Sequence, residues 1–203
     1  MGKIFYIMGK SSSGKDTIYE ELLKREELQL YPLVIYTTRP IRAKETDGVE
    51  YHFTDEEELQ KFLTEGKVIE LREYQTIHGP WKYFTVDDQH IALDQRDYLT
   101  IGVLDSYRKM KEYYGQECVV PIYIQVEDGK RLERALKRER KQTEPKYEEM
   151  CRRFLADQRD FSTEKLREAG ITKRFQNDEE REACIEQVAQ YIREIQNVLQ
   201  ISQ

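Results

Sequence analysis

The sequence has 203 residues, of which 35% are charged and 38% are hydrophobic, with a formal net charge of −6. This length suits one domain with insertions and is short for two. The acidic balance argues against a nucleic-acid polymer as partner. No apolar run approaches the roughly 20 residues of a membrane span, and the strand-like start leaves no room for a signal peptide. We therefore expect a cytoplasmic protein without a membrane partner.

The three cysteines predict neither a disulfide framework nor a zinc site. Cys118, Cys151 and Cys184 are odd in number, far apart and never arranged as C-x-x-C. We expect them to be packing or surface residues.

The first predicted element is a short buried strand over residues 3–8, and a helix is predicted over 15–29. Between them lies a G-x-x-x-x-G-K loop, from Gly9 to Lys15. In this context the loop's backbone N–H groups and the helix N-terminus surround a phosphate, and the lysine reaches the outer phosphates. A serine-rich turn that only caps the helix is the alternative. The pattern predicts a nucleoside triphosphate site formed by Gly9, Ser11, Ser12, Ser13, Gly14, Lys15, Asp16 and Thr17.

One position of this loop departs from the usual pattern. The residue after the lysine is normally a serine or threonine whose hydroxyl completes a magnesium shell, but here it is Asp16, with Thr17 one residue later. Asp16 could bind the metal directly or through water, or Thr17 could replace it. We expect Mg²⁺ as the cofactor and leave its protein ligand open.

The remaining elements alternate between strands and helices, which favours an α/β domain with a parallel sheet covered on both faces. Further strands are predicted at 33–36, 98–104, 119–125 and 171–175, and further helices at 105–114, 128–140, 146–160 and 179–199. Residues 37–97 break this rhythm and indicate an insertion, with a small helix near 55–64 and strands near 67–73 and 81–86.

A second motif opens the insertion. Arg39 and Arg42 lie three residues apart with Pro40 between them, and planar guanidinium groups at this spacing suit an anion. Taken alone, two solvated surface arginines are the more common explanation.

The longer segment changes that balance, because it resembles the guanylate kinase motif T-T-R-x-x-R-x-x-E-x-x-G-x-x-Y-x-F. The matching residues, with intact spacing, are Thr37, Thr38, Arg39, Arg42, Glu45, Gly48, Tyr51 and Phe53. Guanylate kinases move a phosphoryl group from ATP to GMP. The resemblance implies that Arg39, Arg42 and Tyr51 hold the phosphate of the acceptor nucleotide.

The resemblance also implies an architecture. We expect a single guanylate kinase-like domain over 1–203, with a P-loop fold and a five-stranded parallel sheet. Its core would be 1–36 and 91–203, with a monophosphate-binding insertion over 37–90 and a short lid over 138–147.

The base-recognition residues match less closely. Residues 67–70 are similar to the family's F-I-E element, which implies that Glu70 accepts hydrogen bonds from guanine N1–H and the exocyclic amine. An exposed strand glutamate is the alternative. Tyr83 and Thr85 stand for the family's Y-G-S/T, but Phe84 replaces the glycine. Ile35 stands where family members often carry a serine.

The family's D-I-D element retains one acid, Asp105, at the end of a predicted strand, where ligands bind in open parallel sheets. It would contact the acceptor base, or magnesium through water, and a helix N-cap is the alternative.

The basic stretch over 130–159 supplies the predicted lid. Arg153 matches the family's K/R-R-L element, and Arg138 and Arg140 are alternatives for the lid arginine. With Lys15, these groups would spread positive charge over the migrating phosphoryl group; a solvated helical face is the alternative. Asn177 matches an N-D element near the adenine of ATP, with turn formation as the alternative.

The function that follows is phosphoryl transfer from ATP to GMP. Two alternatives stay open: a kinase of another nucleoside monophosphate or small phosphorylated acceptor, and a non-catalytic binding module. The sequence predicts no oligomeric state.

Overall fold

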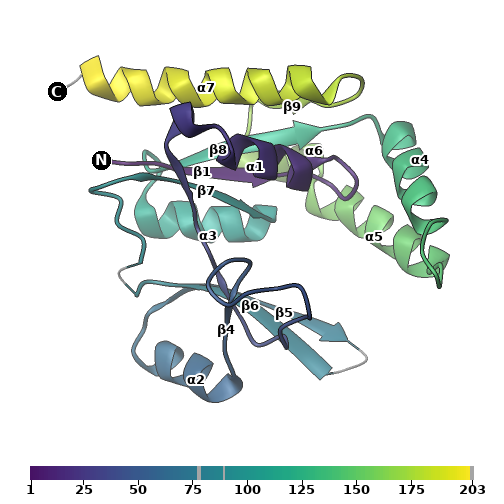
Figure 1. The fold of residues 1–203 in the computed structure, drawn as a ribbon, viewed down its shortest axis with the longest axis horizontal. Coiled ribbons are helices and arrows are strands. Elements are labelled where there is room, and N and C mark those ends of the chain that lie inside the picture. Colours follow the sequence, from purple (N-terminus) through teal and green to yellow (C-terminus); the bar gives the residue numbers. More distant parts are fainter. Residues whose placement is uncertain (77–78, 89, 202–203) are drawn as a thin grey trace.

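The computed structural model describes residues 1–76, 79–88 and 90–201. It consists of a five-stranded sheet between helices and a smaller four-stranded sheet beside it (Figure 1). Positions 77, 78 and 89 of the predicted insertion, and the last two positions of the predicted domain, lie outside the described residues.

The larger sheet is parallel throughout, as predicted. Its strands, in spatial order, are β2 (Leu30–Pro32), β7 (Asp97–Gly102), β1 (Ile4–Met8), β8 (Val119–Gln125) and β9 (Arg174–Gln176). Strand β1 lies in the middle because all five of its residues are apolar and buried. Successive side chains point to opposite faces of a strand, so β1 contributes to a core on each side.

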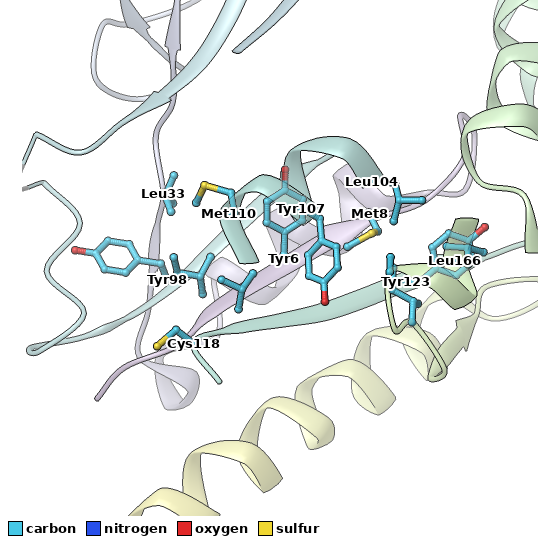
Figure 2. Packing of buried hydrophobic residues seen from close by; sticks show 14 of the residues in the cluster. Tyr6, Met8, Leu33, Tyr98, Leu104, Tyr107, Met110, Cys118, Tyr123 and Leu166 are labelled. Atoms are coloured by element: carbon cyan, nitrogen blue, oxygen red, sulfur yellow. The ribbon is translucent and has the colours of Figure 1, made fainter. Parts of the chain in front are cut away.

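Helices cover both faces. On one side α1 (Lys15–Leu23) and α7 (Arg181–Ile201) pack Ile18 and Val188 against Phe5 and Ile7. On the other side α3 (Leu104–Tyr114) and α6 (Thr163–Glu168) pack Tyr107 and Leu166 against Tyr6 and Met8, as Figure 2 shows. This two-sided burial positions the carboxyl end of β1, from which the phosphate loop begins.

Helices α4 (Asp128–Glu139) and α5 (Tyr147–Asp160) form a hairpin at one end of the core (Figure 1). The predicted lid over 138–147 corresponds to the connection between these helices and to their adjoining ends.

The smaller sheet has the order β4-β3-β6-β5. It contains β3 (Tyr36–Thr37), β4 (His52–Phe53), β5 (Val68–Thr76) and β6 (Gly79–Val86), and α2 (Glu56–Thr64) covers one face. Leu59 of α2 packs on Phe84 and Val86 to form a third, small core. The insertion therefore has its own sheet, helix and core.

Two predicted boundaries are wrong near the first helix and the second strand. The helix ends at Leu23 rather than residue 29, because Gln29 adopts φ 49° and a 3-10 turn, η1 (Glu26–Leu28), buries Leu28 completely. The edge strand of the core sheet is Leu30–Pro32 rather than 33–36. Tyr36 belongs instead to the smaller sheet, where its ring stacks on Phe84.

The carboxyl-terminal part has two further differences. The last strand, predicted over 171–175, is Arg174–Gln176, and the short helix α6 was not predicted. Ser162 accepts a hydrogen bond from the Lys165 backbone and caps α6. No helix in the described ranges is long and apolar enough to cross a membrane.

Candidate active site

The phosphate loop requires both of its glycines. A Cβ at Gly9 would lie 2.5 Å from the carbonyl oxygen of Ile124, and a Cβ at Gly14 would lie 2.6 Å from Nδ2 of Asn177. Gly14 also has φ 83°, a conformation that glycine adopts at little cost. Ser12 has φ 63°, so the loop turns sharply before α1 begins at Lys15.

The loop is built to receive an anion. The hydroxyl oxygens of Ser12 and Ser13 and the Oδ1 atom of Asn177 are buried, and none has a hydrogen-bond partner in the part of the chain that the structure describes. Buried polar atoms are normally satisfied, and the α1 N-terminus adds a partial positive charge. Lys15 stands beside them with its side chain 21% exposed. These features fit a phosphate group.

Asp16 and Thr17 differ in where they lie. The Asp16 carboxylate is 76% exposed, and its Oδ2 atom is 3.4 Å from the Lys15 ammonium. Thr17 lines a cavity with Glu21 of its own helix and Ile185 of α7, away from the loop. Magnesium in kinases uses one or two protein carboxylates plus substrate phosphates, so Asp16 fits that role better than Thr17. Within the described residues, no group of three or more His, Cys, Asp or Glu side chains could hold a metal.

The α4–α5 hairpin holds the phosphate loop through a buried arginine that sequence reasoning missed. The Arg131 side chain is 1% exposed, and its Nη1 atom donates to the carbonyl oxygen of Ser11 over 2.9 Å. Asp157 accepts the Ser11 backbone N–H over 2.8 Å, and Asp128 accepts two further bonds from Arg131, of 2.9 and 3.0 Å. Both backbone groups of Ser11 are therefore held by the hairpin.

The structure separates the three predicted lid arginines. Arg138 and Arg153 line one small cavity, of about 110 Å³, together with Ser11 and Ser12 of the loop, whereas Arg140 does not line it. Arg153 is held by Glu149, whose Oε1 atom lies 2.9 Å from the arginine Nε. Arg138 and Arg153 therefore lie beside the phosphate loop.

Glu149 holds the side chains of Arg152 and Arg153. It forms a two-pronged ion pair with Arg152, over 2.6 and 2.8 Å, in addition to its bond with Arg153. These arginines, Arg152 foremost, lower the pKa of the Glu149 carboxyl to about 2.

Asn177 lies beneath the loop. Its side chain is buried, and Nδ2 donates to the carbonyl oxygen of Ser13 over 2.7 Å. The contact supports the loop directly under Gly14. An amide nitrogen carries two N–H groups, and the Oδ1 atom has no partner among the described residues, so the pairing of Asn177 with adenine stays a prediction.

Arg39 forms a buried ion pair beside the smaller sheet. Its side chain is 3% exposed and forms a two-pronged ion pair with Glu45, over 2.8 and 3.0 Å. Its guanidinium carbon lies 5.3 Å from the Tyr51 ring centroid and 5.5 Å from that of Phe53. Arg42 is exposed, and its backbone N–H donates to Glu45. Glu45 thus organises both arginines of the motif.

The altered segment Tyr83-Phe84-Thr85 keeps its two polar residues on the site side. Strand alternation directs Phe84 into the small core under α2, where it is fully buried. Tyr83 faces Tyr51, with ring centroids 5.5 Å apart, and Thr85 reaches Glu70. Replacing a glycine by Phe84 therefore fills the core behind the sheet and not the site.

Glu70 lies in a buried polar cluster that we call the Glu70 cluster, formed by Glu70, Arg72, Thr85 and Ser106. Arg72 donates from Nε to Oε2 over 3.1 Å and from Nη2 to Oε1 over 3.2 Å. Thr85 donates to Oε1 over 3.0 Å, and Ser106 of α3 donates to Oε2 over 2.8 Å. Glu70 is therefore not the exposed strand glutamate of the alternative prediction.

Arg72 and Ser106 were missed by the sequence analysis. Arg72 could have been found, because residues two apart on a strand share a face. Burial acts to lower the pKa of Arg72, but the charge and hydrogen bond of Glu70, together with Tyr6 and Tyr74, outweigh it, so the net shift is upward. No spacing in the sequence relates Ser106 to Glu70, so Ser106 could not have been found in this way.

Asp105 does not belong to this cluster. It is exposed in the first turn of α3, where Val103 is the N-cap, so Asp105 is not the cap either. The α3 residue that faces Glu70 is Ser106. A side chain at Gly102 would collide with the hydroxyl of Tyr6, so the strand before α3 ends in a glycine.

With the site described, the chain can be compared with known proteins. A family model described as guanylate kinase matches residues 1–195. The chain belongs to the guanylate kinase family. It is therefore a nucleoside monophosphate kinase, a transferase of a class that uses ATP and a nucleotide acceptor and generally needs a divalent metal ion.

Individual relatives agree with this assignment. Guanylate kinase of Malacoplasma penetrans is 27% identical over 154 residues, which cover 75% of this chain and 76% of that protein. Guanylate kinase of Thermotoga maritima is 34% identical over 113 residues, or 55% of this chain and 53% of the relative. The alignment with the second relative thus spans about half of its length.

A solved structure shares the fold. Guanylate kinase from Anaplasma phagocytophilum superposes with a TM-score of 0.59 at 20% sequence identity, covering 100% of this chain and 86% of that one. At this identity the likeness concerns the fold alone, and it agrees with the predicted P-loop architecture.

Proposed function

We propose that this guanylate kinase-family protein transfers the γ-phosphoryl group of ATP to GMP, giving ADP and GDP, with Mg²⁺ as the metal. The observation that carries the proposal is the pairing of two anion sites, the phosphate loop with its unpartnered Ser12 and Ser13 hydroxyls and the buried Arg39–Glu45 pair. A geometric link between the insertion and the core is the hydrogen bond from Ser106 of α3 to Glu70 of β5, over 2.8 Å.

The donor half would bind ATP through residues 9–17. Loop N–H groups and the two serine hydroxyls would receive the phosphates, and Lys15 would reach the outer ones. Asp16 would hold Mg²⁺, which would offset the negative charge of the phosphates. Asn177 would keep the loop in shape from below.

The acceptor half would bind GMP. Arg39 and Arg42 would grip its phosphate, with Tyr51 and Tyr83 as hydroxyl donors. Glu70 and Thr85 would recognise the base, as the resemblance implies, and Asp105 lies outside the cluster that these two residues form with Ser106. We further propose that residues 37–90 form the monophosphate-binding insertion and that residues 138–147 form the lid. We also propose a cytoplasmic location.

The chemistry asks little of the protein beyond alignment and charge. An oxygen of the acceptor phosphate attacks the γ-phosphorus, and the bond from that phosphorus to the β–γ bridging oxygen breaks as ADP leaves. The attacking oxygen is already ionised, so no general base is needed. Arg138 and Arg153 lie beside the loop and would offset the charge that spreads over the transferred group.

The test is a coupled ADP-release assay with GMP, dGMP, IMP, AMP, CMP, UMP and ribose 5-phosphate, each with and without Mg²⁺. We expect the highest kcat/KM with GMP or dGMP, and no turnover without a divalent metal. A clear preference for another acceptor would overturn the guanine assignment, and no ADP release with any acceptor would favour a non-catalytic module.

A further inference from the structure

We propose that Arg72 determines acceptor specificity by competing with the acceptor base for Glu70. In this arrangement a guanine base binds only when the Arg72 guanidinium leaves the carboxylate. The inference rests on the proposed function, since it assumes that the acceptor base approaches Glu70.

Glu70 already uses its full capacity to accept hydrogen bonds. An ionised carboxylate offers about four acceptor positions on its two oxygens. Oε1 receives Arg72 Nη2 and the Thr85 hydroxyl, and Oε2 receives Arg72 Nε and the Ser106 hydroxyl. All four positions are therefore used within the protein itself.

A guanine base would need one acceptor position on each oxygen of Glu70. Guanine presents two donors on one edge, N1–H and the exocyclic amine, and a carboxylate recognises it by accepting both. The hydroxyls of Thr85 and Ser106 can rotate to other acceptors, but each occupies only one position on its own oxygen. Arg72 takes one position on each oxygen, as the guanine edge would, so Arg72 is the direct competitor.

The ion pair that guanine would have to displace, between Arg72 and Glu70, is a strong one. The Glu70 side chain is 2% exposed and that of Arg72 is 18% exposed, so the ion pair is largely shielded from water. Charge-assisted two-pronged pairs are the strong class of hydrogen bond, and they strengthen where the dielectric is low. Displacing Arg72 therefore has a substantial cost, which must reduce the affinity for GMP.

The pair also changes what the site offers. With Arg72 in place, the negative charge of Glu70 is neutralised, and the guanidinium adds further N–H groups that can only donate. Such a site favours acceptor groups over the donor edge of guanine. We therefore expect weaker discrimination between GMP and other monophosphates than a free carboxylate would give.

The test compares the protein with Arg72→Met, which keeps most of the side-chain stem and removes the charge. GMP binding is measured by calorimetry without ATP, and kinetics are measured over the acceptor panel. We expect Kd and KM for GMP to fall by about tenfold or more, the factor that corresponds to one regained charge-assisted bond. For IMP, which lacks the amine, the gain should be smaller, and KM for ATP should stay within about twofold.

Two further variants test whether the gain in GMP binding depends on Glu70 and on the position of the arginine. In the double variant Glu70→Gln, Arg72→Met the gain for GMP should vanish, because the amide presents a donor to guanine in place of an acceptor. Arg108→Met, an exposed arginine of α3 paired with Glu168, is the matched control and should change nothing.

The outcomes separate the two proposals. If Arg72→Met folds but binds GMP no more tightly than the unaltered protein, or more weakly, Arg72 does not compete and the inference is wrong. If neither protein transfers a phosphoryl group to any acceptor, the proposed function fails, while the calorimetric comparison still decides the role of Arg72. Should Arg72→Met be unfolded by circular dichroism, Arg72→Lys replaces it, with a smaller gain expected because lysine cannot bridge both oxygens.

Discussion

Arg131 of helix α4 donates to the carbonyl oxygen of Ser11 across a separation of 120 residues, and it is almost completely buried while doing so. Its positive charge is balanced by Asp128 and Asp157, and Asp157 in turn accepts the Ser11 N–H. The helical hairpin that carries the predicted lid is thereby joined to the tip of the phosphate loop. Movement of the hairpin and the shape of the loop must be coupled at Ser11.

Removing this arginine should affect both stability and ATP binding. In Arg131→Met, two carboxylates lose their buried partner, and we expect the free energy of unfolding to fall by about 3 kcal/mol. KM for ATP should rise while KM for GMP stays unchanged, because only the donor loop is released. Urea denaturation and steady-state kinetics measure these effects. Lys137→Met, at an exposed position of the same helix, is the control. Its free energy of unfolding should stay within about 0.5 kcal/mol of that of the unaltered protein. Equal effects of the two substitutions would refute the coupling.

Lys15 should matter for turnover far more than for folding. Its side chain is partly exposed and lies near Asp16, over 3.4 Å, so its loss leaves no buried charge behind. We expect Lys15→Ala to lower kcat about 10²–10³-fold, as loss of a charge-stabilising group does, with little change in the unfolding midpoint. Unchanged turnover in a folded variant would show that the proposed mechanism is wrong.

The contact between Asn177 and Ser13 leads to a test that separates two roles. Asn177→Ala leaves the buried Ser13 carbonyl without its donor, which should cost about 1–3 kcal/mol of stability. If Asn177 only supports the loop, kcat/KM should fall equally with ATP and GTP as donors. A changed ratio between the two donors would instead support the predicted pairing with adenine. Asp178→Ala tests the neighbouring position, where the carboxylate accepts the Glu127 backbone N–H.

The parts of the site that were predictable are contiguous in sequence. The phosphate loop and the segment around Arg39 each need several residues at fixed short spacings, because one strand–loop–helix or one turn carries them. Local patterns also located β8 and α5 to within one residue, since β8 is a nearly continuous apolar run and Pro145 stands just before α5. Spacing carries physical information where the backbone between the residues has a single conformation.

The parts that were missed join distant segments. Arg131 and Ser11, or Ser106 and Glu70, meet only because the sheet order brings β8 beside β1 and α3 beside β5. No local spacing encodes these contacts. The helix predicted through residue 29 failed for a related reason: the burial of Leu28 in the core outweighed the helix propensity of the charged residues around it.

Glu149 should make stability depend on pH in the acid range. Its pKa in the folded protein is about 2, lowered from 4.5 chiefly by Arg152, so its contribution is present above pH 4.5 and is lost as the pH falls toward 2. The pair is well exposed, and solvent screening limits the contribution to about 1 kcal/mol or less. The difference in unfolding free energy between the protein and Glu149→Gln should therefore shrink as the pH falls. Glu148→Gln, at the adjacent exposed position, should show a smaller and flatter difference; a Glu149 difference that does not change with pH would contradict the assignment.

We propose Arg138 rather than Arg140 as the lid arginine. Both side chains are exposed, but Arg138 shares a cavity with Ser11, Ser12 and Arg153, and Arg140 does not line it. Because charge stabilisation in phosphoryl transfer requires a guanidinium beside the transferred group, we expect Arg138→Met to lower kcat by about a hundredfold or more. Arg140→Met should change kcat only slightly, and neither variant should alter KM for GMP. Single-turnover measurements at saturating ATP isolate the chemical step from product release. A larger loss of rate in Arg140→Met than in Arg138→Met would mean that Arg140 is the lid arginine.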